Sequence, residues 1–226
     1  MAEGDAKPTL TLVGHAAFRP FRNVWMLEEL GVPYEYVPCR PRSREAQRFS
    51  PLGKVPALQD GDFVMYESAA INTYLGDKFR STAAAELVPP AGTKERGRYE
   101  QLISFIITEV DAQGLWIHRK HEALPEQFKG MFTAIPEAVS VAKAHFAQVV
   151  GVLAADLQRS GEPFLLGRGF SAADILFVHC LQWAKDIAWL PLQDADTNAI
   201  LTGYMELCES REAHGRAVAK KRASML

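Results

Sequence analysis

The sequence predicts an α/β domain followed by an all-helical domain. Strand and helix patterns alternate over about the first eighty residues, which is typical of a small α/β unit. After a stretch rich in small residues and proline, the β signals end and helical spacing dominates. The chain has 226 residues, of which 48% are apolar, so two small domains with packed cores fit. We expect the first domain at 1–80, a linker at 81–93 and the helical domain at 94–226.

The first strand and helix are marked by their ends. TLTLVG at 9–14 is predicted to be a short buried strand. Pro20 suits the first turn of a helix and Gly31 its end, and apolar residues recur at helical spacing between them. A second strand follows at 34–38. A strand, a helix and a strand this close predict a parallel pair with a right-handed crossover.

A hairpin and a third helix complete the first domain. The segment 43–49 is polar and predicted to be a short helix, and 55–58 and 63–65 are predicted strands. Asp60-Gly61 between them is a strong hairpin signal. Helical spacing returns at 67–79. Beyond the linker, four stretches have helical patterns: 94–121, 136–160, 171–190 and 197–221.

Composition excludes several classes of function. The net charge is only −2, and the short basic runs are mixed with acids, so nothing indicates a nucleic-acid partner. The N-terminus is polar, and we find no apolar run of the ~18 residues that a membrane span needs, so no membrane partner is expected. The three cysteines are far apart, which predicts neither disulfides nor a zinc site and favours a reducing, cytoplasmic location.

The stretch GKVPALQDGDFVMYES at 53–68 combines features that suit a peptide-like ligand. A residue before proline is extended, so Val55 could pair its backbone with a ligand strand, most readily beside a cis Pro56. Glu67 and Ser68 stand at a predicted helix start, where N–H groups and the helix dipole attract anions. Together they suit a ligand end that carries a carboxylate and an ammonium group. Alternatively, Ser68 only caps the helix.

With these residues the sequence resembles the glutathione transferase superfamily, soluble type. The resemblance rests on SPLGKVPALQDGDFVMYES, on RPFRNVWMLEELGVPYEYV at 19–37 and on GRGFSAADILFVHCLQWA at 167–184, and it covers nearly the whole chain. It implies a thioredoxin-like N-terminal domain, an all-helical C-terminal domain and a homodimer. It also implies that glutathione is the co-substrate and a small hydrophobic electrophile the second partner.

The resemblance assigns roles to the glutathione-binding residues. Val55, beside a cis Pro56, would pair with the cysteinyl backbone of glutathione. Glu67 and Ser68 would hold the γ-glutamyl end, and Lys54 is placed to meet the glycine carboxylate as a point charge. In the helical domain, Ser171 and Asp174 match the family's capping box, whose role is structural.

The catalytic group of the family is missing from its expected position. Catalysis needs the glutathione thiolate, and many members supply a Ser, Tyr or Cys just before the first helix. That position falls on Phe18 here, or on Ala17 in another alignment, and neither side chain can donate. We hypothesise that Arg19 and the N-terminus of the helix stabilise the thiolate instead. The alternative is that Arg19 is a surface or interface cation.

The electrophile pocket is expected to use the first loop and the middle of the fourth helix, as in the family. This selects Phe18, Asp111, Leu115 and Trp116, although ordinary packing between domains explains Leu115 and Trp116 as well. No metal site is expected, because a histidine pair without a third ligand does not define one.

Two functions therefore stay open from the sequence. One is an enzyme in which activated glutathione attacks an electrophile, in conjugation, dehalogenation or peroxide reduction. The other is a binding protein that keeps the glutathione groove with little catalytic activity. The missing hydroxyl favours the second, and the retained set of Lys54, Val55-Pro56 and Glu67-Ser68 favours the first. The electrophile and the pathway cannot be read from the sequence.

Overall fold

A computed structural model describes residues 10–122, 130 and 133–224. The chain divides into two compact units. The first comprises Met1–Val88 and Glu209–Leu226, and the second Pro89–Cys208. The last stretch of the chain thus packs with the N-terminal residues, whereas the sequence suggested one helical domain over 94–226.

The first unit contains a four-stranded mixed sheet in the order β2-β1-β3-β4. Its strands are β1 Leu10–Val13, β2 Glu35–Val37, β3 Ala57–Asp60 and β4 Phe63–Tyr66. β1 and β2 are parallel, as a right-handed crossover through α1 requires, and β1–β3 and β3–β4 are antiparallel. The parallel pair and the mixed sheet confirm the predicted α/β class and the thioredoxin-like unit.

The hairpin turn lies one residue later than the sequence suggested. Asp60 pairs with Phe63, so the two loop residues are Gly61 and Asp62, not Asp60 and Gly61. Gly61 has φ of +61°, the left-handed value that the first central position of a type II′ turn requires. Asp60 instead accepts a hydrogen bond from the Tyr74 hydroxyl at 2.6 Å and an ion pair from Lys78 of α3. It fastens the hairpin to that helix.

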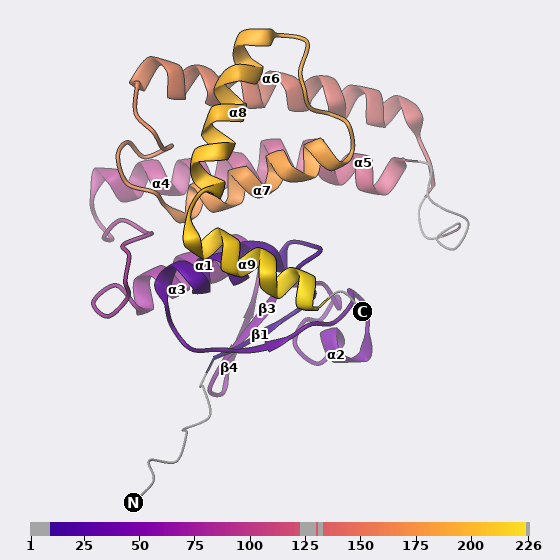
Figure 1. Ribbon diagram of the computed structural model, residues 1–226. Helices are drawn as coiled ribbons and strands as arrows, with labels where there is room; N and C mark the ends of the chain where they lie inside the picture. Colours follow the sequence, from indigo (N-terminus) through magenta and orange to yellow (C-terminus); the bar gives the residue numbers. More distant parts are fainter. Residues whose placement is uncertain (1–9, 123–129, 131–132, 225–226) are drawn as a thin grey trace, which may run out of the picture. The chain divides into compact units, whose positions relative to one another are not determined.

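The described residues of the first unit form four helices: α1 Pro20–Leu30, α2 Arg44–Gln47, α3 Ser68–Lys78 and α9 Glu212–Ala223. α1 begins at Pro20 and ends at Gly31, which has φ of +67°, as predicted. α1 packs on β1, on α3 and on α9 (Figure 1). The core residues Leu12, Val24 and Leu58 are fully buried.

Ion pairs fasten α9 to α1. Arg211 donates two hydrogen bonds of 2.7 Å to the two carboxylate oxygens of Glu29, which is also bonded by the Trp25 indole at 3.0 Å. Arg216 reaches Glu28 at 3.1 Å. Arg211 has an extended backbone and separates α9 from the preceding helix, so the predicted single helix over 197–221 was wrong.

The second unit is helical, as predicted. Its helices are α4 Lys94–Phe105, the π-helix η1 Ile106–Leu115, α5 Trp116–His121, α6 Pro136–Ser160, α7 Ala172–Asp186 and α8 Ala195–Glu209. η1 packs on both α6 and α7. The predicted helix over 94–121 is therefore continuous, but its middle is a π-helix, in which the Trp116 N–H reaches back five residues to the carbonyl of Asp111. Gly114 lets η1 pack closely on α6, because a Cβ at this position would lie only 3.3 Å from the ring of Phe146.

The Ser171–Asp174 capping box forms at the start of α7. The Ser171 N–H and hydroxyl each donate to Asp174 Oδ2 at 2.8 Å. Asp174 Oδ1 accepts from the Leu165 N–H at 2.9 Å and from the Tyr204 hydroxyl at 2.8 Å. Burial raises the pKa of Asp174 above its usual range, although the hydrogen bonds act in the opposite direction. The box thus joins the helix start, the loop before it and α8.

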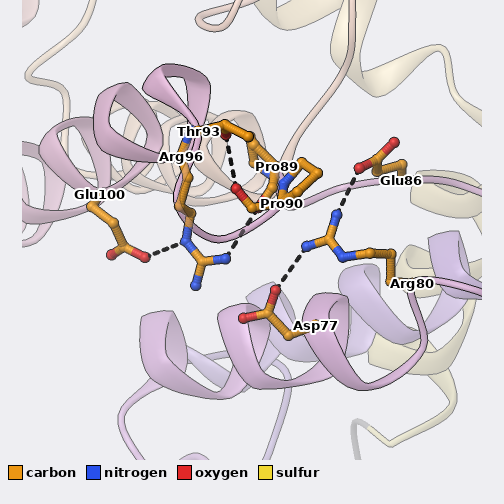
Figure 2. Close-up of polar contacts among 8 residues, drawn as sticks. All are labelled: Asp77, Arg80, Glu86, Pro89, Pro90, Thr93, Arg96 and Glu100. Carbon is orange, nitrogen blue, oxygen red and sulfur yellow. Dashed lines mark hydrogen bonds and ion pairs between the residues drawn. The ribbon is translucent and has the colours of Figure 1, made fainter.

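The predicted linker is bonded to the helices at its two ends (Figure 2). At its start, Arg80 donates to Asp77 of α3 at 2.8 Å and to Glu86 at 2.6 Å. At its end, Arg96 of α4 donates to the Pro89 carbonyl at 3.1 Å and to Glu100 at 2.6 Å. The segment is therefore ordered by arginine contacts despite its linker-like composition.

Among the residues that the structure describes, one helix meets the length and composition criterion for a membrane span, which the sequence pattern did not predict. An 18-residue window of α6 has a mean hydropathy of 1.5, and 33% of that window is buried. The core helix of a soluble protein meets the same criterion, so this helix alone is weak evidence of a membrane segment.

Candidate functional site

Four of the predicted ligand residues lie just beyond the same end of the β3–β4 hairpin. The last strand pair is Ala57 with Tyr66, so the residues just beyond it are Val55-Pro56 on one side and Glu67-Ser68 on the other. The Val55-Pro56 peptide bond is cis. The hairpin therefore brings together two dipeptides that are separated in the sequence.

Gly14 brings this end of the sheet against the start of α1. A Cβ on Gly14 would lie 2.6 Å from the Val55 side chain and 2.7 Å from the Pro20 ring. The residue also has φ of +123°, which side-chain-bearing residues rarely adopt. Only glycine permits Val55 and the first turn of α1 to approach so closely.

Glu67 has an unusual backbone conformation at the start of α3. It occupies the N-cap position with φ of +75° and ψ of 112°, and its side chain makes no capping hydrogen bond. A non-glycine residue in such a region costs on the order of 1–3 kcal/mol, and such outliers cluster at functional sites. Its side chain is exposed, so the carboxylate can reach a ligand.

Ser68 does not cap the helix. It is the first residue of α3, it is only 4% exposed, and its Oγ accepts a hydrogen bond from the guanidinium of Arg22 at 3.2 Å. Because a guanidinium can only donate, the hydroxyl proton must point elsewhere. Within the part of the chain that the structure describes, this proton has no acceptor. A buried hydroxyl with an uncommitted proton, at the N-terminus of an 11-residue helix, is suited to donate to an anion.

Two buried asparagine side chains hold the backbone of Ser68 in place. Asn23 donates to the Ser68 carbonyl at 2.9 Å and to Asn72 Oδ1 at 2.7 Å, and both asparagines are fully buried. The Asn23 Oδ1 atom has no hydrogen-bond partner among the described residues. Sequence reasoning missed Arg22, Asn23 and Asn72. The available signal was a polar residue on the apolar face of each helix, which is rarely tolerated without a partner.

Lys54 is exposed and directly precedes Val55 in the chain. Gly53, with φ of +60°, turns the chain immediately before it, and the Gly53 carbonyl accepts from the Arg42 N–H at 2.7 Å. Lys54 therefore lies at the same end of the hairpin as the other predicted ligand residues.

The loop before α1 is held by residues other than the expected catalytic ones. The Ala17 N–H donates to His15 Nδ1 at 2.9 Å, so His15 Nε2 carries the proton and donates to the Ser224 carbonyl at 2.8 Å. The Tyr36 hydroxyl accepts from the Ala16 N–H at 2.8 Å. These bonds fix the loop that leads to Phe18.

Phe18 and Arg19 stand at the N-terminus of α1. Phe18 is 40% exposed and Arg19 is half-buried at the N-cap position. Pro20 has no N–H, and the N–H groups of Phe21 and Arg22 donate to the carbonyls of Phe18 and Arg19 at 3.0 Å. Pro20, Phe21 and Arg22 therefore offer no N–H group to a ligand. Any stabilisation of a thiolate by this helix start would come from the dipole of α1 and the charge of Arg19.

The residues expected around the electrophile lie in different units. Phe18 belongs to the first unit, and Asp111, Leu115 and Trp116 belong to the second. Asp111 and Leu115 are buried, whereas Trp116 is partly exposed and has the Lys120 ammonium 5.7 Å from the centre of its ring. Of these three, only Trp116 presents appreciable surface to a ligand.

The described residues contain no group of three or more His, Cys, Asp or Glu side chains arranged to hold a metal ion. His118 lies 3.4 Å from Glu122 and packs its ring edge against Trp189. Burial lowers the pKa of His118 below its usual value, in spite of the nearby carboxylate.

Known proteins resemble both units. The family model of the glutathione S-transferase N-terminal domain matches residues 22–83. Glutathione S-transferase 1 of Triticum aestivum is 36% identical over 97 residues. This match covers 41% of this chain and 41% of that relative, so the chain spans about two fifths of the relative's length. Glutathione S-transferase F10 of Arabidopsis thaliana is 30% identical over 159 residues, 68% of this chain and 71% of the relative.

A solved structure matches nearly the whole chain. It is the glutathione transferase URE2P8 of Phanerochaete chrysosporium with oxidized glutathione, which is 25% identical with a TM-score of 0.77, over 98% of this chain and 99% of that one. The family model, the sequence relatives and the fold agree with one another, and the chain belongs to the glutathione S-transferase family.

Proposed function

We propose that this protein is a glutathione transferase, which binds glutathione and promotes attack of its thiolate on a small hydrophobic electrophile. The carrying observation is Ser68, a buried hydroxyl whose proton is uncommitted beside the N-terminus of α3. That arrangement suits the α-carboxylate of a γ-glutamyl group. The exposed Glu67 carboxylate is adjacent and suits the ammonium group of the same ligand end.

The remaining binding residues take the rest of the tripeptide. The backbone of Val55, beside the cis Pro56, pairs with the cysteinyl residue, and Lys54 meets the glycine carboxylate. This division follows the order of charges along glutathione: a zwitterionic head, an uncharged centre and a terminal carboxylate. The solved URE2P8 structure holds oxidized glutathione, which supports the same ligand class here.

Thiolate stabilisation is assigned to Arg19 together with the dipole of α1. No side-chain hydroxyl stands at Phe18 or Ala17, so a positive field must lower the thiol pKa from its usual ~8.5. The test is Arg19→Ala, with the thiolate of bound glutathione titrated by ultraviolet absorbance. We expect its apparent pKa to rise by about one unit, and an unchanged titration refutes this role.

A binding protein with little catalytic activity is the second candidate, and the missing hydroxyl favours it. Retention on immobilised glutathione, followed by assays with a panel of aryl halides, alkyl halides and hydroperoxides, separates the two. Turnover with any of them supports the enzyme, in conjugation, dehalogenation or peroxide reduction. Retention without turnover supports the binding protein, and no binding at millimolar glutathione overturns both proposals.

We propose that the electrophile contacts Phe18, which presents apolar surface.

A cytoplasmic homodimer is proposed as the working form. β4 is an edge strand whose Phe63, Val64 and Tyr66 are 49%, 39% and 48% exposed, and edge strands of this kind favour association. Sedimentation of the wild type and of Val64→Lys tests this: a dimer that Val64→Lys dissociates supports the surface, and a wild-type monomer refutes it.

A further inference from the structure

The second unit contains a pocket that uses none of the residues assigned to glutathione or to the electrophile. Its volume is about 370 Å³, within the range of small-molecule sites. It lies between α4, the C-terminal end of α6 and the segment 161–170 that leads into α7. Its lining includes Arg98, Leu102, Leu153, Asp156, Arg159 and Phe164.

The wall formed by segment 161–170 is fixed by hydrogen bonds. The backbones of Phe164 and Gly167 exchange two hydrogen bonds of 3.0 Å, and the Phe164 ring packs edge-on against Phe170. The N–H of Leu165 donates to the buried carboxylate of Asp174 at 2.9 Å. The capping box of α7 thus holds one wall of the pocket in place, so a ligand would meet a preformed site.

The floor of the pocket is apolar. Leu102, Leu153 and Leu157 line it and are buried, with Phe164 and Leu165 beside them. The one hydroxyl in the lining is already committed: Ser160 donates to the Leu157 carbonyl at 3.0 Å and accepts from a backbone N–H at 3.2 Å. The floor therefore suits an apolar group.

The rim of the pocket carries an excess positive charge. Arg98 donates to Asp156 Oδ2 at 3.0 Å, and Arg159 donates to the other oxygen of the same carboxylate. Two guanidinium groups therefore share one carboxylate, which leaves a net charge of +1 in this cluster (two cations minus one anion). Each guanidinium has five donors, so both keep N–H groups for a further acceptor. Their side chains are 43% and 75% exposed, which leaves them accessible.

We propose that this pocket binds a small amphipathic monoanion, of the class of aryl or medium-chain carboxylates. The apolar body would lie on the leucines of the floor, and the carboxylate would complete the charge balance at Arg98 and Arg159. Apolar burial provides the attraction, and the arginine pair selects the charge. The site is independent of the glutathione chemistry proposed above.

The probe is 1-naphthylacetate, titrated calorimetrically into the full-length protein. We expect a dissociation constant of about 0.1–1 mM, unchanged by saturating S-methylglutathione, and about tenfold weaker binding of the uncharged 1-naphthylmethanol. Displacement by S-methylglutathione places the probe in the glutathione or electrophile site and overturns the proposal. Absence of binding up to about 5 mM also overturns it.

Two charge variants locate the bound anion. Arg159→Glu, at an exposed position, should weaken 1-naphthylacetate by tenfold or more, whereas the matched Arg168→Glu should bind as the wild type. Arg168 is 91% exposed and lies on the same segment as the pocket wall, but it does not line the pocket. Equal affinity in the two variants refutes the site.

Leu153→Trp, which fills the floor, should abolish binding while the glutathione affinity stays unchanged. Wild-type binding by a folded Leu153→Trp also refutes it.

Discussion

Removing the guanidinium of Arg22 should weaken glutathione binding through Ser68. Arg22 is fully buried and donates to Ser68 Oγ at 3.2 Å, which forces the hydroxyl proton outward. Ser68→Ala removes one hydrogen bond to a charged group, worth about 1.5–3 kcal/mol, so glutathione should bind at least tenfold more weakly. Arg22→Met leaves the hydroxyl free to turn, and we expect a smaller loss, about fivefold or about 1 kcal/mol.

The double variant distinguishes positioning from a general packing effect. If Arg22 acts through Ser68, Arg22→Met should have little further effect on affinity once Ser68 is alanine, a coupling of about 1 kcal/mol. Arg22→Lys, which keeps a donor, should retain part of the affinity. Calorimetric titration with glutathione measures the wild type and the four variants, and thermal unfolding confirms that each is folded. Strictly additive losses would refute the positioning role, and wild-type affinity of Ser68→Ala would refute the proposed glutathione site itself.

Three further predictions concern stability. Gly76→Ala should lower the free energy of unfolding by about 1–3 kcal/mol, because the new Cβ would lie 2.3 Å from the Val88 side chain. Gly97→Ala, whose Cβ would meet no atom within 4 Å, should raise it by about 0.5–1 kcal/mol. Denaturant unfolding compares the two variants, and equal effects would contradict the packing argument. Asp174→Ala leaves buried donors without their acceptor and should cost more than about 3 kcal/mol, so a loss below 1 kcal/mol in the same assay counts against the capping network. Burial lowers the pKa of His214, so the unfolded state binds more protons and the stability of the fold should fall as the pH drops below about 6.5. Thermal unfolding measured against pH should show a smaller decline for His214→Phe than for the wild type. Parallel curves would contradict the role of His214 in this pH dependence.

The order of elements in the first unit could be predicted from local signals. Pro20 and Gly31 delimit α1, and the spacing between strands predicts the parallel pair, because these preferences arise within a few residues of backbone. The boundaries that failed depended on contacts distant in sequence. The break between α8 and α9 occurs where Arg211 becomes extended and binds Glu29, 182 residues away. No local pattern carries that information.

The sequence by itself identified Val55-Pro56 and Glu67-Ser68 as the candidate ligand-binding dipeptides, because their residue types and spacing are visible along one short segment. It also showed that no hydroxyl precedes α1. Only the tertiary structure decided what Ser68 does, since its oxygen accepts from Arg22, 46 residues earlier in the chain, and a hydrogen bond between two helices depends on their packing. The same holds for Gly14, whose missing side chain admits Val55 and Pro20. Residue type sets which bonds a group can make, and the fold sets which of them are left for a ligand.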